Sequence, residues 1–232
     1  KLAFGIGASG EAIYLGLSNA FIVIFYNQVI GLNNALIGFA VALALAGDAI
    51  SDPLVGIISD RWRSRLGRRH PFLIAAPVPM AISLYFIFNP PQWLLDMSSQ
   101  MVLFVWLSIW IIVSRTVMTL FNVPHLALGG ELSKDQHERS QLFSANAIFG
   151  GISGAGFGFV AYSFFFADEV VRASDGALVP GHLAAESYGP LILTACALVV
   201  ITIWTCAAGT AKEIPYLSKA DRQANRLKLK EF

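Results

Sequence analysis

The chain has 232 residues, of which 56% are hydrophobic and only 13% are charged, and its formal net charge is +1. Soluble domains carry about 25% charged residues, and the mean hydropathy here is +0.62, so the composition excludes an ordinary soluble domain. Because the few basic residues alternate with long apolar blocks, we also expect no nucleic-acid partner.

The apolar residues fall in six long blocks. Each block reaches the roughly 20 residues that a helix needs to cross a bilayer. A backbone in lipid must satisfy its own hydrogen bonds, and the short alternating segments of a membrane β-barrel do not occur, so the blocks are predicted to be helices. The sequence therefore predicts an all-α membrane protein in the lipid bilayer, with six transmembrane helices at about 2–28, 35–58, 71–90, 101–122, 141–166 and 187–210.

The basic residues are concentrated in alternate connections. Fourteen of the 16 Lys and Arg lie at the first residue, in the loops 59–70 and 123–140, or after residue 211, whereas the connections on the opposite side contain only Arg172. Cytoplasmic loops of membrane proteins are enriched in Lys and Arg. We therefore expect a multi-pass protein of the cell membrane with both termini in the cytoplasm, and a charged cytoplasmic tail at 212–232.

The first span contains two polar residues, Glu11 and Asn19, eight positions apart and so on roughly one face of a helix. If the N-terminus is cytoplasmic, Glu11 lies about two turns inside the membrane and could meet Asp52 of the second span across a shared cavity. The alternative is that Glu11 extends to the cytoplasmic interface and has no role in binding.

The second span contains two acids four residues apart, Asp48 and Asp52, which share one helix face. Charges inside a membrane normally face a bundle interior or a watery cavity and mark ion pathways. Two ionised carboxylates this close repel each other, so the pair predicts a bound cation or proton. Pro53 leaves the carbonyl of Ala49 without its helical partner, which offers a further oxygen ligand. The alternative is a structural ion pair with Arg115, which lies at a similar depth on the fourth span.

The fourth span has a polar stripe made by Arg115, Thr119 and Asn122, which are spaced by four and three residues. Pro124 follows, and because proline disfavours helix before it, the spacing predicts that this helix ends here. His125 is then expected to lie at the cytoplasmic end of the helix, without a catalytic role.

Between the second and third spans the sequence reads Gly-Ile-Ile-Ser-Asp-Arg and then Arg-Leu-Gly-Arg-Arg, in a loop that is strongly basic. This loop resembles a signature of the major facilitator superfamily. Together with Asp48-x-x-x-Asp52-Pro53, it is similar to the glycoside–pentoside–hexuronide:cation symporters, which include the melibiose permeases. The resemblance implies a gating latch in which an acid at the helix end holds the loop arginines, formed by Gly56, Asp60, Arg61, Arg65, Gly67, Arg68 and Arg69.

The resemblance also implies a fold and a site. The six spans correspond to the N-terminal half of a twelve-helix carrier, built from two three-helix repeats, with residues 212–232 as the linker to a second half. Thr119 matches a position that assists cation binding in the family, and the segment from Glu131 to Arg139 resembles its second cytoplasmic signature. The acids and the arginine that hold sugar in the permeases are replaced here by Ala12, Asn122 and Ala147.

The sequence thus predicts a secondary transporter that couples Na⁺ or H⁺ to the uptake of a small solute, a sugar or glycoside, by alternating access, with a lipid-like solute as the alternative. Asp48, Asp52 and Thr119 are the predicted cation site, and Glu11, Asn19, Arg115 and Asn122 the predicted solute cavity. No catalytic residues, cofactor or metal other than a coupling Na⁺ are expected, because the motifs of known intramembrane hydrolases are missing. The alternative is an orphan half-carrier that acts as a non-transporting membrane partner or sensor.

Overall fold

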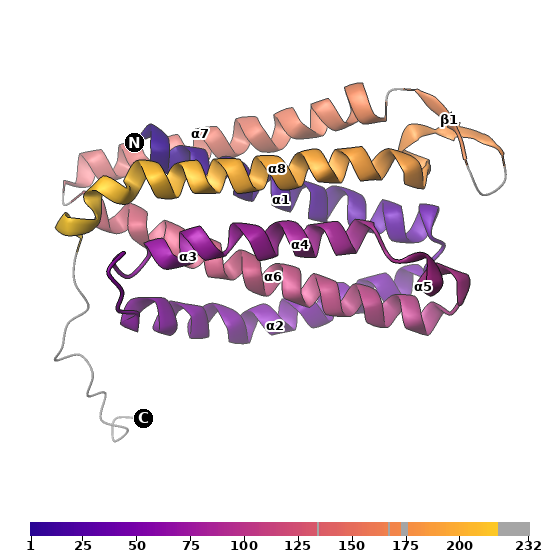
Figure 1. Ribbon diagram of the computed structural model, residues 1–232, viewed down its shortest axis with the longest axis horizontal. Helices are drawn as coiled ribbons and strands as arrows, with labels where there is room; N and C mark the ends of the chain where they lie inside the picture. Colours follow the sequence, from indigo (N-terminus) through magenta and orange to yellow (C-terminus); the bar gives the residue numbers. More distant parts are fainter. Residues whose placement is uncertain (134, 167, 173–175, 218–232) are drawn as a thin grey trace, which may run out of the picture.

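The computed structural model describes residues 1–133, 135–166, 168–172 and 176–217. Within them the chain forms six long apolar helical segments, each of a length and composition that can cross a membrane (Figure 1). Shorter helices and one two-stranded hairpin complete it. The elements are α1 (Leu2–Ile24), η1 (Phe25–Val29), α2 (Asn34–Arg61), α3 (His70–Ala75), α4 (Pro77–Phe88), α5 (Gln92–Asp96), α6 (Gln100–Glu131), α7 (Gln136–Val160), η2 (Ala161–Phe165), β1 (Glu169–Val171), β2 (Leu178–Pro180), η3 (Gly181–Leu183), α8 (Ala185–Thr210) and η4 (Ala211–Tyr216).

The helix ends follow local sequence signals. The side chain of Asn33 accepts a hydrogen bond from the backbone N–H of Ala35 and caps α2, and Asp135 caps α7 in the same way through His137. The third span is divided into α3 and α4 at Pro77, which cannot donate a backbone hydrogen bond. The predicted tail at 212–232 enters the structure only as far as residue 217, and the rest lies outside the described residues.

The prediction that the fourth helix ends near Asn122 is wrong. Helix α6 continues through Pro124 to Glu131, about nine residues beyond the predicted boundary. Proline removes one helical hydrogen bond and disfavours the turn before it, but long membrane helices tolerate it when neighbouring helices pack around the gap. Here Pro124 is buried in the bundle.

The packing of the helices has an internal symmetry. Helix α1 packs against α7 and α8, α6 packs against α2 and α4, and α4 also packs against α8 (Figure 1). If the first, second and third spans are exchanged with the fourth, fifth and sixth, this set of contacts maps onto itself. Such a pattern is expected of two three-helix repeats, which is how the halves of major facilitator carriers are built.

Two helices have little of their surface buried. Only 11% of the apolar window of α2 and of α7 is inside the bundle, compared with 50% for the first span. Large apolar side chains on them are exposed, such as Ile50 at 66% and Ile152 at 69%. In a bilayer these faces can lie against lipid or against further helices, so α2 and α7 are the natural borders of the bundle.

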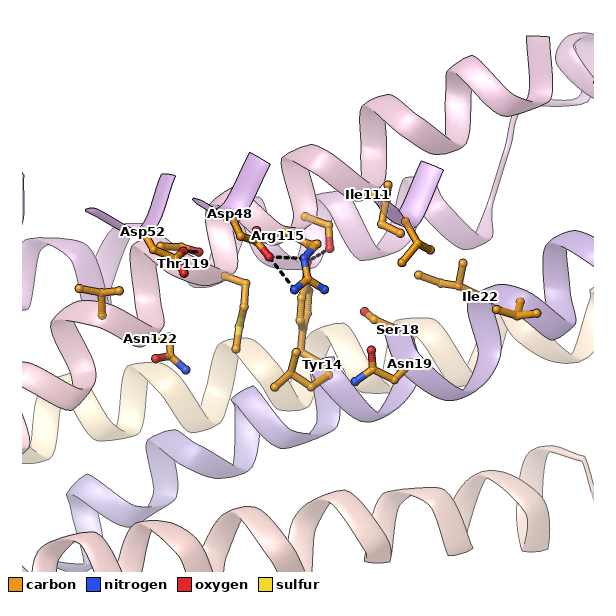
Figure 2. Close-up of a pocket in the computed structure, with 16 residues that line it drawn as sticks. Tyr14, Ser18, Asn19, Ile22, Asp48, Asp52, Ile111, Arg115, Thr119 and Asn122 are labelled. Carbon is orange, nitrogen blue, oxygen red and sulfur yellow. Dashed lines mark hydrogen bonds and ion pairs between the residues drawn. The ribbon is translucent and has the colours of Figure 1, made fainter. Parts of the chain in front are cut away.

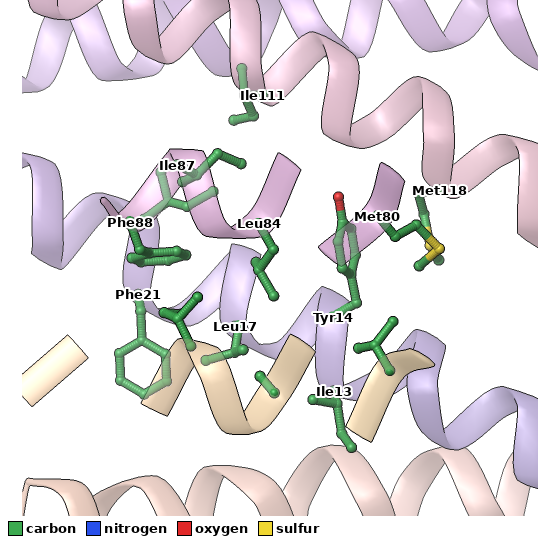
Figure 3. Close-up of a cluster of buried hydrophobic side chains, with 14 of the residues drawn as sticks. Ile13, Tyr14, Leu17, Phe21, Met80, Leu84, Ile87, Phe88, Ile111 and Met118 are labelled. Atoms are coloured by element: carbon green, nitrogen blue, oxygen red, sulfur yellow. The ribbon is translucent and has the colours of Figure 1, made fainter. Parts of the chain in front are cut away.

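The interior of the bundle is an apolar cluster at the crossing of α1, α4, α6 and α8 (Figure 3). Leu17, Met80, Leu84 and Ile87 in it are at most 1% exposed. Tyr14 is in the same cluster, and its hydroxyl group hydrogen-bonds to Ser83 at 3.2 Å and to Ser114. This group of three hydroxyls fixes α1, α4 and α6 relative to one another.

Close contact between α1 and α7 depends on small residues. A Cβ added to Gly150 would lie 3.7 Å from Ala8, and one added to Gly154 would lie 3.5 Å from Ala12. Ala12, which replaces a sugar-binding acid of the resembled permeases, therefore packs in this interface. Small residues at four-residue spacing allow membrane helices to approach closely.

We expect Gly5→Ala to destabilise the bundle and Gly16→Ala on the same helix to have little effect. A Cβ on Gly5 would lie 2.7 Å from Phe149 and 3.2 Å from the carbonyl oxygen of Ala145, whereas a Cβ on Gly16 meets no atom within 4 Å. Overpacking of this kind typically costs about 1–3 kcal/mol. Thermal unfolding of the two detergent-solubilised variants measures the difference, and equal melting temperatures would contradict the packing described here.

Candidate functional site: a polar cavity between α1, α2 and α6

A cavity of about 370 Å³ opens between α1, α2 and α6. Its wall combines apolar side chains with a band of polar ones near the middle of the helices (Figure 2). The polar residues that line it are Tyr14, Ser18, Asn19, Asp48, Asp52, Ser114, Arg115, Thr119 and Asn122. The two acids of α2, the stripe of α6 and Asn19 therefore meet at one opening.

The first contact between α2 and α6 in the cavity is an ion pair. Nε and Nη2 of Arg115 each lie 2.6 Å from Oδ2 of Asp48. The side chains are 33% and 18% exposed, so the pair faces the cavity without being sealed off. Of the two interpretations of Asp48 that the sequence left open, the structural ion pair with Arg115 is present, and an opening lies beside it.

The second contact lies one helical turn further along both helices. The hydroxyl of Thr119 donates a hydrogen bond of 2.8 Å to Oδ1 of Asp52. Asp52 is exposed to the cavity. The two acids therefore have different partners. Asp48 is paired with the positively charged Arg115, whereas Asp52 accepts a hydrogen bond from the neutral hydroxyl of Thr119.

Glu11 and Asn122 form a third polar contact, between α1 and α6. The side-chain amide of Asn122 donates to Oε1 of Glu11. Asn122 lines the cavity, but Glu11 lies behind it, outside the set of lining residues. The Glu11 carboxylate therefore positions Asn122 and does not itself form the wall that the sequence assigned to it.

His125 does not lie at a helix end. Because α6 continues past Pro124, His125 is fully buried, stacked between the rings of Phe4 at 4.4 Å and Phe121 at 4.9 Å. Its Nε2 is 2.9 Å from the side-chain oxygen of Asn146 on α7. The prediction of an end position is wrong, and His125 instead joins α1, α6 and α7 in the core.

Two hydroxyl groups near the site were missed in the sequence. The Oγ atoms of Ser18 and Ser51 are buried and make no hydrogen bond to any part of the chain that the structure describes. Ser51 lies between Asp48 and Asp52 on α2, and Ser18 lines the cavity on α1. For Ser51, the sequence signal that could have indicated it is its position next to an intramembrane acid pair.

The basic loop forms an ionic network at one end of the bundle. Arg69, whose side chain is 7% exposed, lies 2.5 Å from Asp60 and 3.1 Å from Glu131, and it donates a 2.9 Å hydrogen bond to Ser59. Arg68 lies 2.7 Å from the same oxygen of Glu131. The network joins the end of α2, the start of α3 and the end of α6.

The other predicted latch residues have different places. Arg61 and Arg65 are exposed, Gly56 lies inside α2, and Gly67 adopts a positive φ of 78° in the turn of the loop, a conformation that favours glycine. Glu131, which the sequence placed in a separate cytoplasmic signature, is the acid shared by the buried Arg69 and the partly buried Arg68. Lys134 of that signature lies outside the described residues.

This architecture defines a class of protein. Six membrane-spanning helices in two three-helix repeats, with ionisable groups around a mid-helix cavity, form half of a twelve-helix transporter fold. The chain belongs to the MFS/sugar transport protein family, whose profile matches residues 3–231. The prediction of a major facilitator fold is thereby confirmed, as is the prediction that this chain is not an enzyme.

Three relatives of this chain are named as symporters. An uncharacterised symporter of Synechocystis sp. is 33% identical over 155 residues, which are 64% of this chain and 28% of that protein. The putative glycoside/cation symporter YagG of Escherichia coli is 30% identical over 62% of this chain and 30% of its own length. The sodium-dependent lysophosphatidylcholine symporter 1-A of Danio rerio is 28% identical over 60% of this chain and 25% of its own. The chain therefore spans less than a third of each of these relatives.

Proposed function

We propose that this chain is one six-helix half of a secondary transporter that couples the movement of Na⁺ or H⁺ to that of a small solute, a sugar or glycoside. The observation that carries the proposal is the position of Asp48 and Asp52, which open from α2 into one cavity and are contacted there by Arg115 and Thr119. Intramembrane carboxylates in such a cavity are typical of ion pathways.

The coupling ion binds at the two acids of α2. Carboxylate and hydroxyl oxygens are the ligands that hard cations prefer, and Asp48, Asp52 and Thr119, which all line the cavity, supply both kinds. A cation between the carboxylates would relieve their mutual repulsion, as would a proton on one of them. Either ion would reduce the charge that the cavity must hold when it closes.

The solute lies in the same cavity, in contact with Asn19, Arg115 and Asn122. These side chains offer amide and guanidinium donors, which suit hydroxyl-rich solutes. The relatives include a glycoside/cation symporter and an isoprimeverose transporter, which supports a sugar or glycoside. A second six-helix half forms the opposite wall, and rocking between the halves opens the cavity to either side in turn.

A thermal-stability screen of the full-length carrier tests this function and identifies the solute. Only a bound ligand raises the apparent melting temperature. We expect one sugar or glycoside to stabilise the protein, and to do so more strongly when the coupling cation is present. Stabilisation that does not depend on Na⁺ or pH for any solute would contradict cation coupling.

We expect Thr119→Val to weaken binding of the coupling cation, with Thr116→Val as the matched control. Valine keeps the shape of threonine but removes the hydroxyl that donates a hydrogen bond to Asp52. The Thr116 hydroxyl, among the described residues, bonds only to the carbonyl of Ile112 in its own helix. Hydrogen bonds to charged groups contribute about 1.5–3 kcal/mol, so the half-saturating cation concentration should rise about tenfold in the first variant. Cation-dependent uptake by both variants measures this, and equal values would remove Thr119 from the site.

A further inference from the structure

We propose that Arg115 is a tethered cation that occupies the coupling-ion site while the site is empty, so that an incoming Na⁺ must displace its guanidinium from Asp48. This inference rests on the proposed function, because it concerns how the same site is regulated. The proposal identifies Arg115 as a residue that competes with the ion for Asp48, in addition to the residues that bind the ion.

The geometry of the ion pair supports competition. Both Nε and Nη2 of Arg115 approach the same oxygen, Oδ2 of Asp48, at 2.6 Å. A guanidinium carries five N–H donors in a fixed fork, and this arrangement leaves Nη1 outside the pair. An ion that bridges Asp48 and Asp52 would have to share the Asp48 carboxylate with this group, and two cations at one carboxylate repel each other.

Displacement needs only a movement of the arginine side chain. The helix that carries it is fixed at the preceding residue, because Ser114 bonds to the buried hydroxyl of Tyr14, which also contacts Ser83 on α4. The arginine side chain itself is 33% exposed toward the cavity and is therefore free to change rotamer.

The opposite wall offers a place for the displaced guanidinium. Ser18 and Asn19 on α1 line the same cavity across from Arg115 (Figure 2). The Oγ atom of Ser18 is buried and makes no hydrogen bond to the described residues, so it can accept one. A guanidinium released from Asp48 would find an acceptor there, on the side of the cavity that we assign to the solute.

The competition has two thermodynamic consequences. The apparent affinity for Na⁺ is the intrinsic affinity multiplied by the fraction of molecules in which the Arg115–Asp48 pair is open, so a mostly closed pair weakens binding. Because coupling between two binding events is reciprocal, a solute that accepts hydrogen bonds from the released guanidinium raises the affinity for Na⁺, and Na⁺ raises the affinity for that solute. Arg115 would thus link the two binding events.

The test is the Na⁺ dependence of thermal stability in the full-length Arg115→Gln variant, without solute and with choline chloride replacing NaCl to hold the ionic strength constant. We expect the Na⁺ concentration for half-maximal stabilisation to fall about tenfold, within the range usual for coupled sites. If the wild-type carrier responds only to protons, the variant should gain a response to Na⁺. An unchanged or higher midpoint, or no response in the variant, overturns the proposal.

Two further variants keep the test decisive. Arg115→Lys retains the charge but replaces the two-nitrogen contact with one flexible ammonium, so its Na⁺ midpoint should lie between those of the wild type and of Arg115→Gln. If Arg115→Gln does not fold, a lower midpoint in Arg115→Lys than in the wild type is the deciding result. Arg63→Gln, in the exposed loop, should keep the wild-type midpoint. Failure of the proposed function is a separate result, namely wild-type uptake that depends on no cation gradient.

Discussion

The double variant Asp48→Asn with Asp52→Asn is expected to lose cation-driven accumulation of solute completely while still exchanging solute across the membrane. Asparagine preserves the size and the carbonyl acceptor of each side chain but removes the two charges that attract the ion into the cavity. Without an ion to bind, the carrier can equilibrate the solute but cannot concentrate it. Gradient-driven uptake and solute exchange, measured on the same vesicles, separate the two activities.

The single variants provide the control. Asp48→Asn leaves Arg115 without its ionic partner, whereas Asp52→Asn removes an acid whose described contact is a neutral hydroxyl. Loss of one partner of a fully buried pair costs about 3–5 kcal/mol, and allowing for the partial exposure here we expect about 1–2 kcal/mol. The first variant should therefore melt at a lower temperature than the second. Accumulation that persists in the double variant would contradict the assignment of the ion site.

The second large effect is expected from Glu131→Gln at the end of α6. Its carboxylate lies within 3.1 Å of both Arg68 and Arg69, so the substitution leaves two arginines without their shared acid in a largely buried network. Removal of one partner from a fully buried pair costs about 3–5 kcal/mol, and because Arg68 and Glu131 are 19% and 16% exposed we expect about 2 kcal/mol here. Because the network joins α2, α3 and α6, its loss should favour the state in which this end of the carrier is open.

Labelling of a cysteine introduced on the cavity-facing side of α6 measures that shift. Faster labelling from the loop side is expected in Glu131→Gln and also in Arg69→Gln, whose side chain contacts both Asp60 and Glu131. Arg63→Gln, in the same loop but exposed, is the matched control and should label at the wild-type rate. Identical rates in all three variants would show that the network does not act as a latch.

Much of the fold and part of the site could be predicted from the sequence. The six spans follow from apolar blocks, since lipid leaves the backbone few alternatives. The spacing of Asp48 with Asp52 and of Arg115 with Thr119 placed each pair on one helix face, and the matched depth of Asp48 and Arg115 raised the ion pair as one alternative. Which alternative holds depended on the packing of α2 against α6, which periodicity does not determine.

The errors have a common physical origin in contacts between helices. The local preference of proline predicts a helix end at Pro124, but burial between neighbouring helices overrides it. His125 was misplaced as a consequence. Depth and the shared face with Asn19 predict Glu11 in the cavity wall, whereas its position behind Asn122 depends on how α1 is rotated against α6.

The central claim is that a cation enters the cavity beside Asp48 and Asp52 and drives the solute with it. The most direct measurement is solute uptake by the full-length carrier in proteoliposomes, with a Na⁺ gradient or a pH gradient as the only source of energy. We predict accumulation above the external concentration with one of the two gradients, and its collapse when that gradient is dissipated. Uptake that reaches only equilibrium, and at the same rate with either gradient or with none, would contradict the claim.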